Sequence, residues 1–244
     1  MEETQKSYLP VFLFMFAAIY ILARFVVFRT WSPKTRPEAS SCLISLAHGT
    51  PAVVLAVGAV LSENIGFASP NTAAQNLVLD YSIAYFLTDL LHYLVFFPSD
   101  VLFIGHHLAT LFVFLTCRHV VSHGAFAVLS LLILAELTSS CQNAWTLAGA
   151  RRSDVVFAAK LHRLLSPPFY ALYSLVRGFA GPYFLYQMAA FYLSGAADTV
   201  IPRWVWVSWI VVVFTAISVS ILWITNLWVE LYRERTGKLE KKTS

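Results

Sequence analysis

The sequence predicts an all-α, polytopic integral membrane protein, and three observations point to that class. Of the 244 residues, 58% are hydrophobic and only 12% are charged, whereas a soluble domain of ordinary composition carries about 25% charged residues. The mean hydropathy is +0.68. Apolar runs long enough to cross a hydrocarbon core of about 30 Å recur along the chain. The composition therefore excludes an ordinary cytosolic enzyme, a disordered chain and a disulfide-rich secreted module.

Seven apolar runs are predicted to be membrane-spanning helices, since a helix needs roughly 17–25 mostly apolar residues to cross a bilayer. They are the segments 8–28, 42–62, 76–97, 101–117, 123–148, 167–193 and 204–229. The first run ends in Arg24 and Arg29 and lacks a small-residue cleavage site, which favours an anchor over a signal peptide. The last run opens on three tryptophans and closes on Trp228 and Tyr232, as aromatic residues do at membrane interfaces.

Individual residues predict where some of these helices begin or bend. Asp100 is placed to cap the N-terminus of the fourth helix. Pro167 and Pro168 suit the first turn of the sixth, and Pro182 is expected to kink it by removing a hydrogen bond. The polar stretch 149–166 before that helix is expected to form a short amphipathic surface helix with a basic face.

The loop charges predict the orientation. With the N-terminus outside, inner segments hold twelve of the seventeen Lys and Arg residues and outer segments hold three. Cytosolic loops carry the excess of Lys and Arg. We therefore expect a lumenal N-terminus and a cytosolic C-terminus. Because the basic residues follow the loops, the net charge of +4 does not indicate nucleic-acid binding.

The ionisable residues inside the predicted spans are the candidate site, because charged groups in a bilayer are costly and usually functional. At 1.5 Å per residue they lie roughly 8–18 Å from the inner ends of their helices. They are His48, Asp89, His92, His106, His107, Glu136 and Arg177, with Asn143 as a polar neighbour. The outer half of the spans is expected to hold almost no such residue. One layer drawn from five helices predicts a polar site that faces an internal cavity.

The paired histidines carry the sharpest chemical prediction. Adjacent helical residues point about 100° apart, so one of His106 and His107 could act as a base or nucleophile while the other orients a ligand or a carboxylate. Asp89 or Glu136 could hold the imidazole tautomer. The candidate catalytic residues are His106, His107 and Asp89. The candidate lipid-binding residues are Glu136, Asn143, His92, His48 and Arg177.

Other readings of these residues stay open. Glu136 and Arg177 could simply pair with each other, and His48 could bond only a backbone carbonyl. A metal site built from the paired histidines, His92 and Asp89 is an alternative, but no HxxxH or ExxH ligand pair is present. We therefore expect no metal and no cofactor.

Several of these residues together resemble the TLC-domain family, which includes ceramide synthases and translocon-associated membrane proteins. The similarity covers roughly residues 38–235. It is carried by Asp89-Leu90-Leu91-His92-Tyr93, Pro98, His106-His107 with Thr110, and Glu136-Leu137-Thr138-Ser139-Ser140 with Asn143 and Trp145. The stretch from Glu136 to Trp145 is similar to the non-synthase, plant-type branch. The resemblance implies a six-helix barrel with a lipid-sized central cavity in the endoplasmic reticulum.

The resemblance also bears on chemistry. In ceramide synthases the paired histidines, a later His-Asp pair and a further Asp transfer an acyl chain from acyl-CoA to a sphingoid amine. His106 and His107 match the first pair, but this chain offers Glu136 without a His-Asp dipeptide, and Ala144 stands where an Arg is often found. The departures weigh against acyl transfer and leave lipid binding intact.

These observations predict three segments and one leading function. The segments are 1–37 (lumenal tail, first helix and basic loop), 38–235 (TLC domain) and 236–244 (basic cytosolic tail). We expect a protein that binds or handles membrane lipids at the endoplasmic reticulum, where Lys241 and Lys242 resemble a dilysine retrieval signal. The alternatives are an acyltransferase that takes fatty acyl-CoA as substrate, and a cargo or translocon-associated factor without small-molecule chemistry.

Overall fold

A computed structural model describes residues 6–61 and 65–243 of the chain, and from residue 234 onward it describes the backbone and the Thr236 side chain alone. The residues before Lys6 and the side chains of the dilysine pair lie outside this part. The described residues form α-helices and three π-helical turns. These are α1 (Leu9–Leu22), η1 (Ala23–Val27), α2 (Arg36–Val60), α3 (Ala73–Phe96), α4 (Val101–Leu115), η2 (Thr116–Val121), α5 (Ala125–Glu136), α6 (Ser139–Ala150), α7 (Val156–Leu175), η3 (Val176–Ala180), α8 (Gly181–Leu193) and α9 (Arg203–Thr243).

Each of the seven predicted spans is helical over most of its described residues, which confirms an all-α polytopic membrane protein. Within the described residues, five helical stretches are long and apolar enough to cross a membrane: Leu9–Val27, Arg36–Val60, Val101–Val121, Ala125–Ala150 and Arg203–Arg233. The other two predicted spans correspond to α3 and to the continuous run of α7, η3 and α8. Large apolar side chains face outward, as on Phe14, whose side chain is 78% exposed. Such a surface suits lipid and not water.

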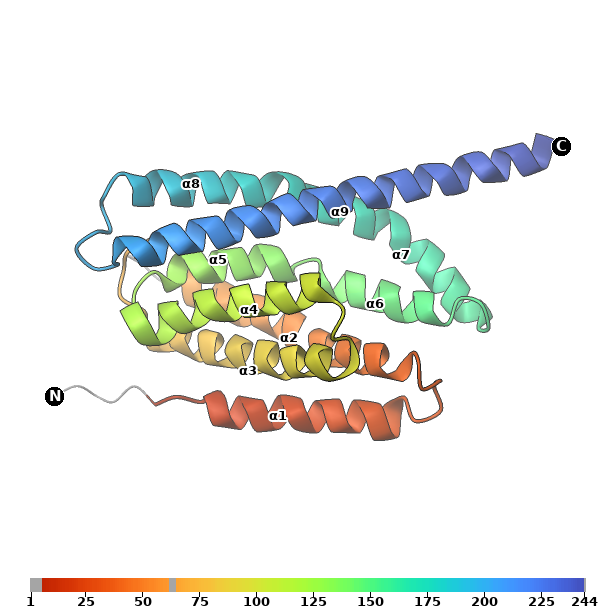
Figure 1. Ribbon diagram of the computed structural model, residues 1–244, viewed down its shortest axis with the longest axis horizontal. Coiled ribbons are helices and arrows are strands. Elements are labelled where there is room, and N and C mark those ends of the chain that lie inside the picture. Colours follow the sequence, from red (N-terminus) through yellow and green to blue (C-terminus); the bar gives the residue numbers. More distant parts are fainter. Residues whose placement is uncertain (1–5, 62–64, 244) are drawn as a thin grey trace.

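The helices run side by side and alternate in direction (Figure 1). The connections at 28–35, 97–100 and 151–155 lie at one end of the bundle, where α9 also extends beyond the other helices. The connections at 122–124 and 194–202 lie at the opposite end, on the same side as the start of α1. The start of α1 and the end of α9 therefore lie on opposite sides of the bundle.

The helix boundaries differ from the prediction in two places. The single span predicted over 123–148 is two helices, α5 and α6, separated by Leu137 and Thr138. The helix predicted to begin at 167 begins at Val156, so Pro167 and Pro168 lie inside α7 instead of in its first turn. The separate surface helix predicted over 149–166 is therefore wrong: residues 156–166 form the first half of α7, and residues 151–155 are the connection before it. α7 continues from this polar segment into the apolar span without a loop.

Two local predictions agree with the structure. The Asp100 carboxylate accepts the Phe103 amide hydrogen at 3.4 Å and so caps α4. The helix expected to kink at Pro182 changes direction there. A π-helical turn, Val176–Ala180, precedes Gly181 and Pro182 at the start of α8, and α7 and α8 lie at an angle to each other (Figure 1). Such turns absorb the backbone bond that proline cannot make.

One expectation about charge is wrong, because the half of the bundle nearer the N-terminus holds a buried ion pair. Arg118 Nε donates to Asp80 Oδ1 at 3.0 Å, and both side chains are almost fully buried. The other oxygen of Asp80 accepts the Tyr8 amide hydrogen at 2.8 Å and the Ser7 hydroxyl at 3.1 Å. Arg118 is therefore a buried ion-pair partner and not an exposed basic residue of an outer loop. The pair instead fixes the start of α1 against α3 and η2.

A surface contact in the 194–202 connection gives a pH prediction. The Arg203 guanidinium donates to Asp198 at 2.7 Å, and the Trp206 indole donates at 3.1 Å. These bonds, Arg203 first, lower the pKa of the Asp198 carboxyl. Their contribution to stability is therefore complete above the unfolded-chain pKa of about 3.9 and is lost as pH falls through the lower folded value. In Asp198→Asn this contribution is absent, so the variant should lose less stability than the wild type as the pH falls. Melting temperatures of both proteins that fall in parallel between pH 5 and pH 2 would contradict it.

Candidate functional site

A buried carboxylate–histidine pair joins α3 to α4. Asp89 Oδ2 lies 2.9 Å from His107 Nε2, and Asp89 Oδ1 accepts the Ser41 hydroxyl at 2.7 Å. His107 Nδ1 lies 2.8 Å from the Phe103 carbonyl, which can only accept, so Nδ1 carries a hydrogen. Because two acceptors cannot bond each other, a proton also lies between Nε2 and Asp89 Oδ2. Both ring nitrogens of His107 are thus engaged within the protein.

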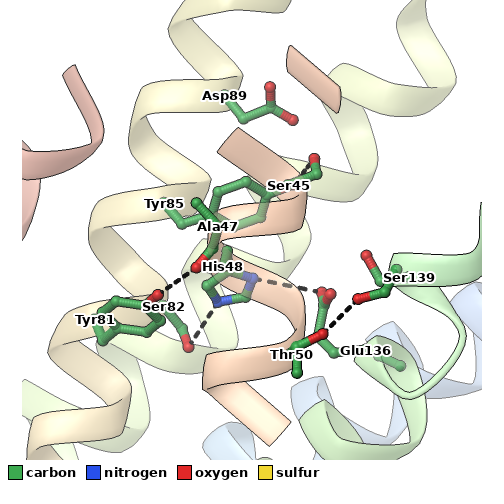
Figure 2. A network of polar contacts seen from close by, with 12 residues as sticks. Ser45, Ala47, His48, Thr50, Tyr81, Ser82, Tyr85, Asp89, Glu136 and Ser139 are labelled. Atoms are coloured by element: carbon green, nitrogen blue, oxygen red, sulfur yellow. Dashed lines mark hydrogen bonds and ion pairs between the residues drawn. The ribbon is translucent and has the colours of Figure 1, made fainter. Parts of the chain in front are cut away.

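A second histidine lies between α2 and α3 (Figure 2). His48 is fully buried and stacks on Tyr85 with ring centroids 4.1 Å apart and planes 9° apart. Its Nε2 bonds the Ser82 hydroxyl at 3.1 Å, and its Nδ1 lies 3.8 Å from a carboxylate oxygen of Glu136. The alternative in which His48 bonds only a backbone carbonyl is therefore not what the structure shows. His48 instead links α3 to the end of α5.

The break between α5 and α6 positions Glu136. Arg177 on η3 donates to the Ala135 carbonyl at 2.8 Å, so a cation occupies the C-terminal end of α5, where the helix dipole favours it. Gly49 on α2 lies against the same break. A Cβ at Gly49 would lie 3.1 Å from both Glu136 Oε2 and Ser139 Oγ. The close approach of α2 therefore depends on glycine there.

A partly open groove lies beside this network and has a volume of about 140 Å³. Its polar lining is gathered around the middle of α4, the end of α5 and η3. These polar residues are His106, Thr110, Glu136 and Arg177. The rest of the wall is apolar and continues along α4, α5 and α9, with Val113, Leu131 and Val212 among its residues. Apolar walls with a few convergent polar groups are typical of ligand sites.

The two neighbouring histidines face different surroundings, as their spacing predicts. His107 is buried against Asp89, whereas His106 is exposed to the groove. Their ring planes are 86° apart. Within the described part of the chain, no hydrogen bond to the His106 ring is found. His106 is therefore the histidine that a bound molecule can contact.

Of the predicted residues that do not line the groove, two also lie outside the contacts described above. His92 faces α1, where its Nδ1 bonds the Tyr20 hydroxyl at 2.8 Å. Asn143 bonds the Ser139 carbonyl of its own helix at 2.9 Å. The alternative in which Glu136 and Arg177 pair with each other is not found among the described residues, where the titratable side chain beside the Glu136 carboxylate is His48, at 3.8 Å.

The polar network contains residues that the sequence analysis did not select. Ser41 and Ser45 follow one face of α2 at a spacing of four, and Ser45 bonds the Tyr85 hydroxyl at 2.6 Å. That spacing was a visible signal, since it continues to Gly49 along the same face. Tyr20 carries no such signal, because its partner is 72 positions away. In the described segments, no group of three His, Cys, Asp or Glu side chains is placed to hold a metal ion.

The fold and this site define a class: a polytopic α-helical membrane protein with a His–carboxylate network inside its bundle. The sequence model of the TLC domain matches residues 38–229. The chain is also 66% identical over 240 residues to a TLC domain-containing protein of Arabidopsis thaliana, which covers 96% of this chain and 94% of that protein. This chain belongs to the TLC-domain family. No solved structure matches it.

Proposed function

We propose that this protein binds the acyl chain of a membrane lipid in the groove, with the polar end of the lipid at His106, Glu136 and Arg177. The observation that carries the proposal is the separation of polar and apolar lining along one groove. A molecule with an acceptor at one end and a hydrocarbon chain behind it matches both parts. Such a role fits lipid handling in the membrane.

The groove suits part of a lipid better than a whole small molecule. Its volume of about 140 Å³ is below the roughly 300–1,000 Å³ of drug-sized sites. Because the groove is partly open, the remainder of the ligand can stay in the bilayer. Arg177 Nε is buried without a hydrogen-bond partner, and a lipid carbonyl or carboxylate at this end would supply one.

The test is binding of cis-parinaric acid, a fluorescent fatty acid, to the purified full-length protein. Arg177→Met removes the cation at the polar end, and Ala216→Phe fills the groove from α9. We expect each variant to weaken binding by about tenfold or more. Arg177→Met removes a hydrogen bond to a charged group, which contributes about 1.5–3 kcal/mol, and Ala216→Phe occupies the space of the acyl chain. Arg163→Met and Ala190→Phe change exposed residues outside the groove and should bind like the wild type.

Two outcomes would overturn the proposal. One is equal affinity in the groove variants and the controls when all of them melt at similar temperatures. The other is release of CoA from long-chain acyl-CoA that is lost in His106→Ala, which would show that the protein cleaves the thioester and passes the acyl group to water or to an acceptor. Against transfer, both nitrogens of His107 are already engaged, so His106 alone remains available as a base.

We also propose that the protein resides in the endoplasmic reticulum with its C-terminus in the cytosol. The end of the bundle that carries the C-terminus also carries Arg36, Arg151 and Arg152, and basic residues favour the cytosolic side. On a cytosolic tail, Lys241 and Lys242 would be readable as a retrieval signal. Replacing both with alanine should move a tagged protein to later compartments. An unchanged distribution would contradict this location.

A further inference from the structure

A second pocket lies outside the groove, at the end of the bundle where the basic connections gather. It has a volume of about 260 Å³ and lies between the start of α2, the end of α6 and the first half of α7. Glu38, Arg152 and His162 are the charged or titratable residues that line it. Gly149 and Trp145 form part of its wall. None of these residues belongs to the His–carboxylate network.

The two oppositely charged side chains of the pocket do not pair. Within the part of the chain that the structure describes, neither Glu38 nor the guanidinium of Arg152 forms an ion pair or hydrogen bond. The neighbouring Arg151, in contrast, donates to Asp154 at 2.7 Å and lies over the Trp31 ring at 5.2 Å. An anion and a cation on one cavity wall, each exposed and without a partner, can bind a ligand that carries both charges.

The aromatic part of the pocket is held rigidly. Trp145 stacks on His162 with centroids 4.8 Å apart and planes 26° apart. The Trp145 indole donates to Ser166 at 2.8 Å. A Cβ at Gly149 would lie 3.1 Å from His162 Cδ2, so the imidazole is seated against backbone. One tryptophan whose face is covered by an imidazole is no aromatic cage, the feature that recognises quaternary ammonium groups.

We propose that this pocket binds a phosphate monoester or diester that carries a primary ammonium group, as in the phosphoethanolamine headgroup. Arg152 and His162 would contact the phosphate, since Arg presents a fork of donors that matches phosphate oxygens. Glu38 would accept from the ammonium. A purely anionic headgroup would meet Glu38 unfavourably, and a choline group cannot donate to it. The proposal concerns a pocket separate from the groove and does not rest on the proposed function.

The experiment is native mass spectrometry of the full-length protein in detergent, titrated with three phospholipids of identical chains. We expect phosphatidylethanolamine to bind about tenfold more tightly than phosphatidylcholine or phosphatidylglycerol. Arg152→Gln and Glu38→Gln should each remove this preference, because each deletes one charge-assisted hydrogen bond. Both side chains are exposed, so neither variant should impair folding. Arg163→Gln, an exposed cation of α7 outside the pocket, is the matched control.

A titration with soluble O-phosphoethanolamine identifies the source of the ligand. Affinity as high as that of the lipid would support a soluble phospho-amine as the ligand, and much weaker binding would support the lipid headgroup. The preference should persist in Ala216→Phe, so that failure of the groove and failure of this pocket give different results. Equal binding of the three lipids, or a preference for phosphatidylglycerol that Arg163→Gln reduces as much as Arg152→Gln, would overturn the proposal.

Discussion

Asp89→Ala is expected to lower the free energy of unfolding by about 3–5 kcal/mol, the cost of removing one partner from a buried charged pair. The Asp89 side chain is 3% exposed, accepts the Ser41 hydroxyl and is hydrogen-bonded to His107 Nε2. Without it, the Ser41 hydroxyl and His107 Nε2 lose their partner inside the bundle. Unfolding of the purified protein in mixed micelles with increasing denaturing detergent measures the change.

Asp154→Ala is the matched control for this variant. Asp154 also pairs with a basic side chain, at 2.7 Å from Arg151, but its own side chain is 52% exposed. An exposed pair of this kind contributes only about 0–1 kcal/mol. If both alanine variants unfold at the same detergent fraction as the wild type, burial does not make the Asp89 pair important. Asp89→Asn keeps the size of the side chain, and its free energy of unfolding should lie between those of Asp89→Ala and Asp154→Ala.

The sequence predicts the spans because membrane insertion is a local property. A run of apolar residues must form a helix in lipid to satisfy its own backbone, so the seven runs needed no partner to be recognised. The start of α4 was equally local, because Asp100 caps the helix that follows it. The break after Glu136 was not local. No Pro or Gly lies between Ala125 and Thr138, and the Ala135 carbonyl is taken by Arg177, 42 positions later.

The candidate site shows the same division between local and distant causes. Ionisable residues in apolar helices identified the buried network and the polar end of the groove, because such residues must be satisfied inside the bundle. Which of them meet depends on helix packing. His92 faces Tyr20 of α1, and His48 meets Glu136, although both histidines were assigned to one lipid site. Helical spacing within one element did separate His106 from His107.

Asp80→Ala should be about as destabilising as Asp89→Ala and should also free the first helix. Asp80 is completely buried and accepts from Arg118, Ser7 and the Tyr8 amide. Its loss leaves Arg118, itself 5% exposed, without this acceptor, at a cost of about 3–5 kcal/mol. Ser7→Ala removes one neutral donor and should cost only about 1 kcal/mol.

The double variant Asp80→Leu/Arg118→Met separates the cost of an unpaired charge from the value of the pair. Apolar replacement of a whole buried pair is often neutral or stabilising. The double variant should therefore be more stable than Asp80→Leu alone, as measured by the same detergent unfolding. In Asp80→Leu, the Tyr8 amide that starts α1 also loses its acceptor, so limited proteolysis should cut earlier within residues 6–12 than in the wild type. Equal stability of the single and double variants, with no earlier cleavage, would mean that apolar packing of α1 on α3 holds the first helix without this pair.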